Sequence, residues 1–177
     1  WWAMFITMVG DSTAFASLVF GYFFYWTIHD DFTAGVIGPG MKWPLLSAAL
    51  FVAAWLMVLM ARHLNGRGSI ILTRAVLAVG VVLAVVASTA GFAGPWQYGM
   101  DPRAHVYAAI VWLLTAWTLV HAATGAVMLA YCLARHFAGR LTKDHDMDIG
   151  NVALYWHFMA ITAVVTFIVI GLFPEVL

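Results

Sequence analysis

Five long apolar segments constrain this 177-residue chain more than any other feature of its sequence. Each is near or above the length of about 20 residues that an α-helix needs to cross the hydrocarbon core of a bilayer. They are Trp1–Trp26, Trp43–Ala61, Ile70–Phe92, His105–Ala134 and Gly150–Phe173. We therefore predict an all-α membrane protein, a bundle of five transmembrane helices in which residues 1–177 form a single domain.

The composition supports this class of fold. Hydrophobic residues make up 64% of the chain and charged residues 9%, and the mean hydropathy is +0.94. A soluble domain has about a quarter of its residues charged, so this chain cannot cover itself with a soluble surface. The zero net charge argues against a nucleic-acid partner, and the single cysteine, Cys132, excludes an intrachain disulfide.

The first segment carries one carboxylate, Asp11, near its middle. At helical rise Asp11 lies about 15 Å below Trp1, roughly the midplane of the bilayer. An ionised group there costs several kcal/mol unless it is paired, protonated or hydrated. Small residues beside it, spaced to allow close approach of a neighbouring helix, are Ala3, Thr7, Gly10, Ala14, Ser17 and Gly21. We expect Asp11 to face the bundle as a polar or lipid-contacting site.

The distribution of basic residues predicts the orientation in the membrane. Arg62, Arg67 and Arg74 bracket the loop after the second segment, and Arg135, Arg140 and Lys143 follow the fourth. The opposite loops hold only Lys42 and Arg103. Because cytoplasmic loops carry the excess of Lys and Arg, we expect the N-terminus inside and the C-terminus outside.

Three ionisable side chains lie well inside the predicted spans: Asp11, His121 and His157. They could form a proton relay or a buried polar cluster, or each could be satisfied by a local hydrogen bond. An alternative is a membrane b-type cytochrome, with one haem held between His121 and His157. A third is a small transporter or channel in which Asp11 binds an ion, although the chain lacks an inverted repeat.

The run from Lys143 to Asp148 concentrates acidic residues and a histidine, in the order KDHDMD. It lacks the glycine turn and distal glutamate of a dedicated calcium loop. We interpret it as an acidic cap at the start of the fifth helix, because carboxylates stabilise a helix N-terminus. We expect no metal site in it.

Two motifs on the last two segments indicate a family. Thr115, His121 and Gly125 occupy matching positions of a spaced His–Gly motif, and Tyr155 to Phe158 read Y-W-H-F. Arg135 and His145 fall at fitting intervals between them. On these residues the chain resembles subunit III of the haem–copper terminal oxidases, the cytochrome c and quinol oxidases.

The match also has departures. Ala116 and Thr118 stand where the family motif has its first glycine and first histidine. Asp11 occupies the position of an acidic residue in the family's third span. The middle of the chain, about residues 43–103, matches only in hydropathy.

The resemblance implies a non-catalytic accessory subunit without a redox centre of its own. In the family, haem and copper belong to subunit I, and subunit III packs in the complex of subunits I and II. It binds phospholipid, stabilises subunit I and supports its proton uptake, so we expect these partners and a bound phospholipid here. The residues it suggests for a lipid-binding or buried polar role are Asp11, His121, Arg135, His145, Trp156 and His157.

Two expectations concern the context of the chain. The family usually has seven spans, so we expect a five-span form, a fragment, or part of a fusion to subunit I. We expect a bacterial inner membrane, with a cytoplasmic N-terminus and a periplasmic C-terminus. The electron donor of the complex, cytochrome c or quinol, stays open.

Overall fold

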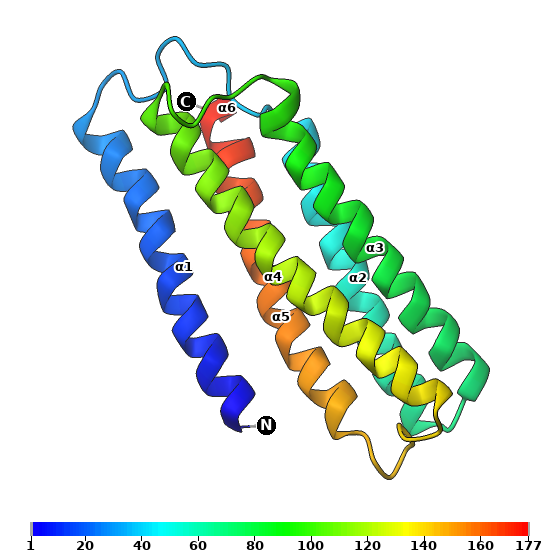
Figure 1. Cartoon of the computed structure of the whole chain (residues 1–177). Helices are drawn as coiled ribbons and strands as arrows, with labels where there is room; N and C mark the ends of the chain where they lie inside the picture. Colours follow the sequence, from blue (N-terminus) through cyan, green and yellow to red (C-terminus); the bar gives the residue numbers. More distant parts are fainter. Residues whose placement is uncertain (1, 177) are drawn as a thin grey trace.

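The computed structural model describes residues 2–176 and consists of long helices running side by side (Figure 1). The elements are α1 (Trp2–Ile28), α2 (Lys42–Gly66), α3 (Ile70–Gln97), α4 (Val106–Phe137), α5 (Met147–Phe167), the π-helix η1 (Ile168–Leu172) and α6 (Phe173–Val176). In the described residues, α1 to α4 and the continuous α5–η1 rod are each long and apolar enough to cross a membrane. The expected fold class, an all-α bundle of five spans, is confirmed.

The helix ends differ from the predicted segments by a few residues. α3 continues past Phe92 to Gln97 and contains Pro95 in its last turn. α5 begins at Met147 and not at Gly150, with Asp148 in its first turn. A carboxylate is favourable there because the first backbone N–H groups of a helix carry partial positive charge. The position of Asp148 agrees with the predicted acidic start of the helix, whereas the N-cap residue, Asp146, makes no side-chain cap hydrogen bond.

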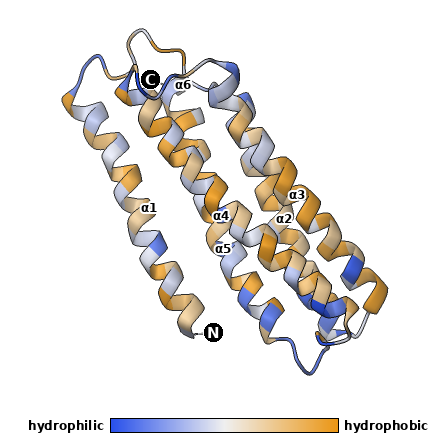
Figure 2. Cartoon of the chain, in the orientation of Figure 1, coloured by the Kyte–Doolittle hydropathy of each residue, from blue (hydrophilic) through white to orange (hydrophobic). Residues whose placement is uncertain are grey.

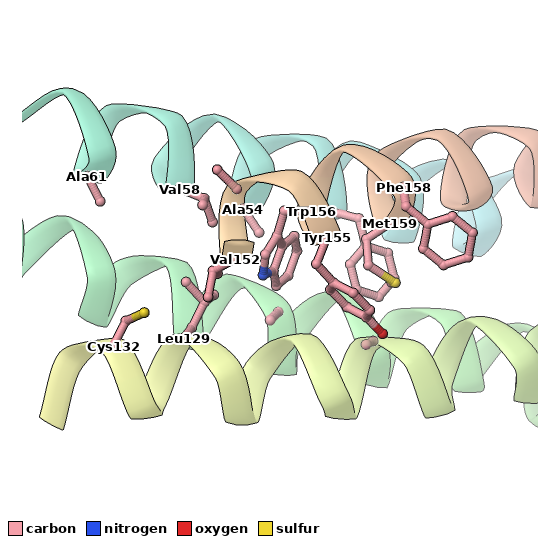
Figure 3. Packing of buried hydrophobic residues seen from close by; sticks show 14 of the residues in the cluster. Ala54, Val58, Ala61, Leu129, Cys132, Val152, Tyr155, Trp156, Phe158 and Met159 are labelled. Carbon is pink, nitrogen blue, oxygen red and sulfur yellow. The ribbon is translucent and has the colours of Figure 1, made fainter. Parts of the chain in front are cut away.

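α2, α3, α4 and α5 form the tightly packed part of the molecule. α3 lies against α2 and α4, and α5 lies against α2 and α4. Trp156 of α5 is fully buried, and Figure 3 shows it among side chains of the neighbouring helices, with Ala54, Val58 and Leu129 nearby. A buried aromatic side chain of this size is one of the largest single contributions to a core.

α1 packs more loosely, against α4 and α5 (Figure 1). Its buried residues are Met8, Phe15 and Tyr22, one every two turns, which form a single narrow contact line. The small residues Gly10 and Ala14 lie outside this line and are exposed. The prediction that the small-residue stripe receives a neighbouring helix is wrong within this chain, because large side chains make the contact instead.

The polar residues gather at the two ends of the bundle, as Figure 2 shows by the hydrophilic colouring of the connecting loops. The start of α1 lies at the same end as the α2–α3 and α4–α5 connections, and α6 lies at the opposite end (Figure 1). This arrangement agrees with an odd number of spans. It also places the basic residues of both connections at one end.

The last rod changes its helical pitch within the bundle. α5 passes without interruption into η1, a π-helical turn of five residues. π-turns are rare and occur mostly as local insertions in α-helices. Here the turn is close to α2, since a Cβ atom on Gly171 would lie 3.0 Å from Cβ of Pro44. The sequence does not predict this π-helical turn.

Candidate functional site

Asp11 and His121 meet between α1 and α4, about a third of the way along α1 and half way along α4. Asp11 Oδ2 lies 3.5 Å from His121 Nε2. The side chain of His121 is 13% exposed and that of Asp11 is 31% exposed. The expectation that Asp11 faces the bundle agrees with this contact. The carboxylate is nevertheless still accessible from outside the chain.

The hydrogen bonds of His121 determine which of its nitrogens carries a proton. Nδ1 lies 2.8 Å from the carbonyl oxygen of Trp117. A carbonyl only accepts, so Nδ1 must donate, and in a neutral ring Nε2 would then present a lone pair to Asp11. A lone pair facing an ionised carboxylate is unfavourable. The 3.5 Å contact places an acid and an imidazole face to face between α1 and α4.

Aromatic residues enclose this acid–imidazole pair. The ring of Trp117 lies 4.4 Å from that of His121, and the ring of Phe158 lies 5.5 Å away on the α5 side. Tyr155 Oη donates to the carbonyl oxygen of His121 at 2.9 Å and so ties α5 to α4. These contacts cover His121 on the α4 and α5 sides, while Asp11 stays partly exposed.

Close packing between α4 and α5 explains the glycine at position 125, the third matching residue of the His–Gly motif. A Cβ atom there would lie 3.2 Å from Cζ2 of Trp156 and 3.2 Å from Cε1 of Tyr155. That is closer than ordinary van der Waals contact, so glycine permits α4 to approach the Y-W-H-F segment. The two motifs therefore meet at one helix–helix contact.

His157 lies apart from this pair and borders a groove between α1 and α5. Its Nδ1 donates to the carbonyl oxygen of Ala153 at 2.6 Å, and its ring packs edge-on against Trp55. The groove has a volume of about 540 Å³. Its walls are mainly apolar side chains: Phe5, Met8, Val9, Phe15, Ala16, Val19, Leu154, Phe158, Ile161 and Val165, with Ser12, His157 and Thr162 as the polar members.

A second, more polar cavity adjoins the groove at the end where α5 begins. It has a volume of about 240 Å³ and shares Leu154 and His157 with the groove. Arg62 and Asn151 are among its lining residues. An apolar channel that ends beside an arginine has the chemical character of a site for an amphiphile.

Arg135 is engaged within the chain. Its Nη1 lies 3.0 Å from Asp148 Oδ2 and donates to Tyr131 Oη at 3.1 Å. Its Nη2 donates to the carbonyl oxygen of Arg140 at 3.3 Å. His145 is exposed in the following connection, where its backbone N–H donates to the carbonyl of Thr142. A shared role of Arg135 and His145 at a lipid phosphate stays a prediction.

Trp156, the remaining residue suggested by the resemblance, is a core residue. It is 0% exposed and lies between the other helices of the packed unit (Figure 3). It therefore cannot touch lipid directly. Its contribution to the site is to fix the position of its neighbours Tyr155 and His157.

Sequence reasoning missed two polar contacts at the basic end of the bundle. Asp148 was interpreted as a helix cap, and its pairing with Arg135 was not foreseen. Arg74 donates through Nε to Nδ1 of His136 and through Nη2 to the His136 carbonyl, both at 3.2 Å. The spacing of these residues in the sequence contains no signal for either contact. Within residues 2–176, no three His, Cys, Asp or Glu side chains gather so as to hold a metal ion.

The fold and this site together define a multi-pass, all-α membrane protein with an acid–imidazole pair deep between its helices. Comparison with known proteins then gives a family relationship. No family model matches the chain. It is similar to cytochrome c oxidase subunit 3 of Zea mays, 31% identical over 140 residues that cover 76% of this chain and 50% of the relative.

Further relatives have the same name. Cytochrome c oxidase subunit 3 of Locusta migratoria is 23% identical over 171 residues, 89% of this chain and 63% of the relative. That of Oenothera berteroana is 27% identical over 138 residues, 76% of this chain and 50% of the relative. The chain thus spans between half and somewhat under two thirds of these curated relatives. The resemblance to subunit III of the terminal oxidases is confirmed.

Proposed function

We propose that this chain is a non-catalytic accessory subunit of a haem–copper terminal oxidase, where it stabilises the catalytic subunit I and supports its proton uptake. The observation that carries the proposal is the match to cytochrome c oxidase subunit 3 over 76–89% of the chain. The expected partners are subunits I and II, and the haem and copper of the complex would reside in subunit I.

The exposed surface of α1 supports a partner or lipid on that side. Only 11% of the most apolar part of α1 is buried within the chain. Large side chains such as Phe20 and Ile6 are 69% and 66% exposed. In a membrane such a surface contacts lipid chains or another helix, because either environment accepts apolar side chains equally well.

The groove between α1 and α5 is the proposed phospholipid site. Its apolar walls suit an acyl chain, and Arg62 in the adjoining cavity suits a phosphate, since arginine presents several donors to phosphate oxygens. Arg135 is less suited to this role because Asp148, Tyr131 and the Arg140 carbonyl already occupy its guanidinium. We therefore favour the Arg62 end of the groove over the Arg135–His145 end.

The acid–imidazole pair is the proposed contribution to proton uptake. Asp11 Oδ2 lies 3.5 Å from His121 Nε2, so a carboxyl group and an imidazole, both able to take up a proton, are in contact. Asp11 is partly exposed on the side that a partner would cover. A group of this kind can collect a proton and pass it to a neighbouring subunit.

Purification through an affinity tag on the chain, from the organism that encodes it, tests the proposal. We expect larger subunits containing haem and copper to co-purify in fixed proportion. Asp11→Ala should then speed the loss of oxidase activity during turnover without altering the haem spectrum. Isolation of the chain free of any haem protein under mild detergent would contradict the proposal.

The cytochrome alternative has one observation in its favour. Both His121 and His157 direct Nδ1 to a backbone carbonyl, which is how haem- and metal-ligating imidazoles are commonly held. However, Nε2 of His121, the nitrogen that an iron would take, faces Asp11. Haem ligation would require that pair to separate, so we place this alternative second.

We propose that the N-terminus is cytoplasmic and the C-terminus lies outside, from the distribution of basic residues. The arginines of the α2–α3 and α4–α5 connections lie at the end of the bundle where α1 starts (Figure 1). By the positive-inside rule this end is cytoplasmic in a bacterial inner membrane. A reporter fused after Leu177 should be active only on the outer face.

A further inference from the structure

Four hydroxyl-bearing residues surround a small cavity in the half of the bundle that contains η1. Ser47 comes from α2, Thr115 and Thr118 from α4, and Thr166 from the end of α5. All four are buried, with 4% of Thr115 and 7% of each of the others exposed. The remaining walls are mostly apolar: Pro44, Phe51, Gly91, Leu119, Ala163, Phe167 and Ile170.

The cavity has the size of one water molecule. The space open to the centre of a water-sized sphere is about 20 Å³. A cavity needs roughly 10–15 Å³ on this measure to hold a water, together with two to four polar partners. Both conditions are met here, whereas an apolar void of the same size would stay dry.

One of the four hydroxyls is without a partner. Among residues 2–176, no group forms a hydrogen bond to Oγ1 of Thr115, although this atom is buried. A buried hydroxyl left unpaired costs roughly 1–3 kcal/mol, so such atoms are normally satisfied by protein or by ordered water.

The other three hydroxyls can accept but have already used their protons. Ser47 donates to the carbonyl oxygen of Ala87 at 2.8 Å. Thr118 donates to the carbonyl of Leu114 at 3.0 Å, so the 3.2 Å contact between Thr118 and Thr166 needs the proton of Thr166. Each hydroxyl has one proton and two lone pairs. Ser47 and Thr166 therefore retain lone pairs, and Thr115 retains its proton.

We propose that this cavity is a binding site for a single structural water, which accepts from Thr115 and donates to the oxygens of Ser47 and Thr166. The arrangement uses both protons of the water and one of its two lone pairs, which gives three hydrogen bonds, the usual number for a buried water. The water would join α2, α4 and α5 at the point where α5 passes into η1. The site is independent of the acid–imidazole pair and of the proposed oxidase role.

The test combines a density map with the thermal midpoint of one variant. The midpoint should fall if a water bridges Thr115, and should stay equal or rise if the hydroxyl is unpaired. The chain is purified with the subunits that accompany it, and its structure is determined at a resolution at which ordered waters appear. We expect a density peak within hydrogen-bond distance of Thr115 Oγ1, retained in Thr115→Ser and lost in Thr115→Val.

The thermal midpoint provides the second readout. If water bridges Thr115, the nearly isosteric Thr115→Val should lower the midpoint by about 2–4 °C, because a satisfied bridge is lost. If the hydroxyl is simply unpaired, the same change should leave the midpoint equal or raise it, which would overturn the proposal. Thr89→Val is the control, since Thr89 is exposed and donates to a carbonyl of its own helix.

Should Thr115→Val fail to assemble, the wild-type map and Thr115→Ser decide. A wild-type cavity without density at that resolution would overturn the proposal. A peak present in both forms would support it.

Discussion

α1 and α5 are both long and apolar enough to cross a membrane, yet α1 lies at the edge of the bundle and α5 lies in its interior. The most apolar window of α1 has a hydropathy of 1.5 and is 11% buried, while that of the α5–η1 rod has 2.0 and is 61% buried. α5 lies against two helices of the packed unit, and α1 lies along its side (Figure 1). The comparison teaches that apolar content marks a span but does not tell which neighbours it has.

The reason is physical. In water an apolar side chain is driven inward, but in a bilayer the lipid tails are as apolar as the protein core. Burial in α5 therefore depends on specific close contacts, such as that of Trp156 and Gly125. Attachment of α1 depends on a narrow line of large side chains and on the Asp11–His121 pair.

The largest difference between the two helices should appear on truncating an aromatic side chain in each. Trp156→Ala removes a fully buried residue of α5 and should cost about 3–5 kcal/mol of stability. Phe20→Ala in α1 removes a side chain that is 69% exposed and should cost far less. Thermal unfolding of both variants, purified identically, measures the contrast. Equal losses would mean that α1 is as tightly packed as α5.

Alanine substitutions at two glycines, one in the packed unit and one in α1, test the same difference in packing. Gly125→Ala adds a methyl group against Trp156 and Tyr155 and should destabilise the chain by about 1–3 kcal/mol. Gly10→Ala in α1 meets no atom within 4 Å and should be neutral or stabilising by up to about 1 kcal/mol, because alanine is the better helix former. A destabilising Gly10→Ala would show that a partner packs on the small-residue stripe.

The attachment of α1 can be probed at its polar contact. Asp11→Asn replaces the carboxyl group with an amide of nearly the same size. We expect the α1–α4 contact to loosen, so that the crosslinking yield falls between one cysteine in α1 and one in α4, both placed away from the buried line of Met8, Phe15 and Tyr22. Asp101→Asn, on an exposed connection, is the matched control. An unchanged yield would assign the attachment to Met8, Phe15 and Tyr22 alone.

The smallest effect is expected at the ion pair that joins α4 to the start of α5. Arg135→Gln breaks the 3.0 Å contact with Asp148, but both side chains are about a third exposed. Exposed ion pairs contribute little to stability, and salt screens them. Denaturation at low and high salt measures this contribution, with Arg103→Gln as control. A large, salt-independent loss would indicate that Arg135 holds something more than Asp148.

Much of the fold could be predicted from the sequence because each span depends on local hydropathy. All five spans lie where the apolar segments placed them, and Asp148 lies in the first turn of α5, where its charge is favourable. The depth of Asp11 in a membrane, which helical rise places near the midplane, stays a prediction. That it would meet His121 required the family resemblance and the structure, since the two residues are far apart in sequence.

The unpredicted features all depend on contacts between helices. The sequence predicts that the small-residue stripe of α1 receives a neighbouring helix, but Gly10 and Ala14 are exposed within this chain. The partner of Arg135 and the π-turn after Phe167 depend on how α4, α5 and α2 fit together. Local propensity does not encode such fits.

The central claim is that this chain serves a redox complex without carrying a redox centre itself. The direct measurement is an absorption spectrum of the chain after it has been separated from its co-purified subunits in detergent. We predict that the haem Soret band stays with the other subunits and that the isolated chain shows only its aromatic absorbance. A Soret band that stays with this chain and disappears in both His121→Ala and His157→Ala would contradict the account.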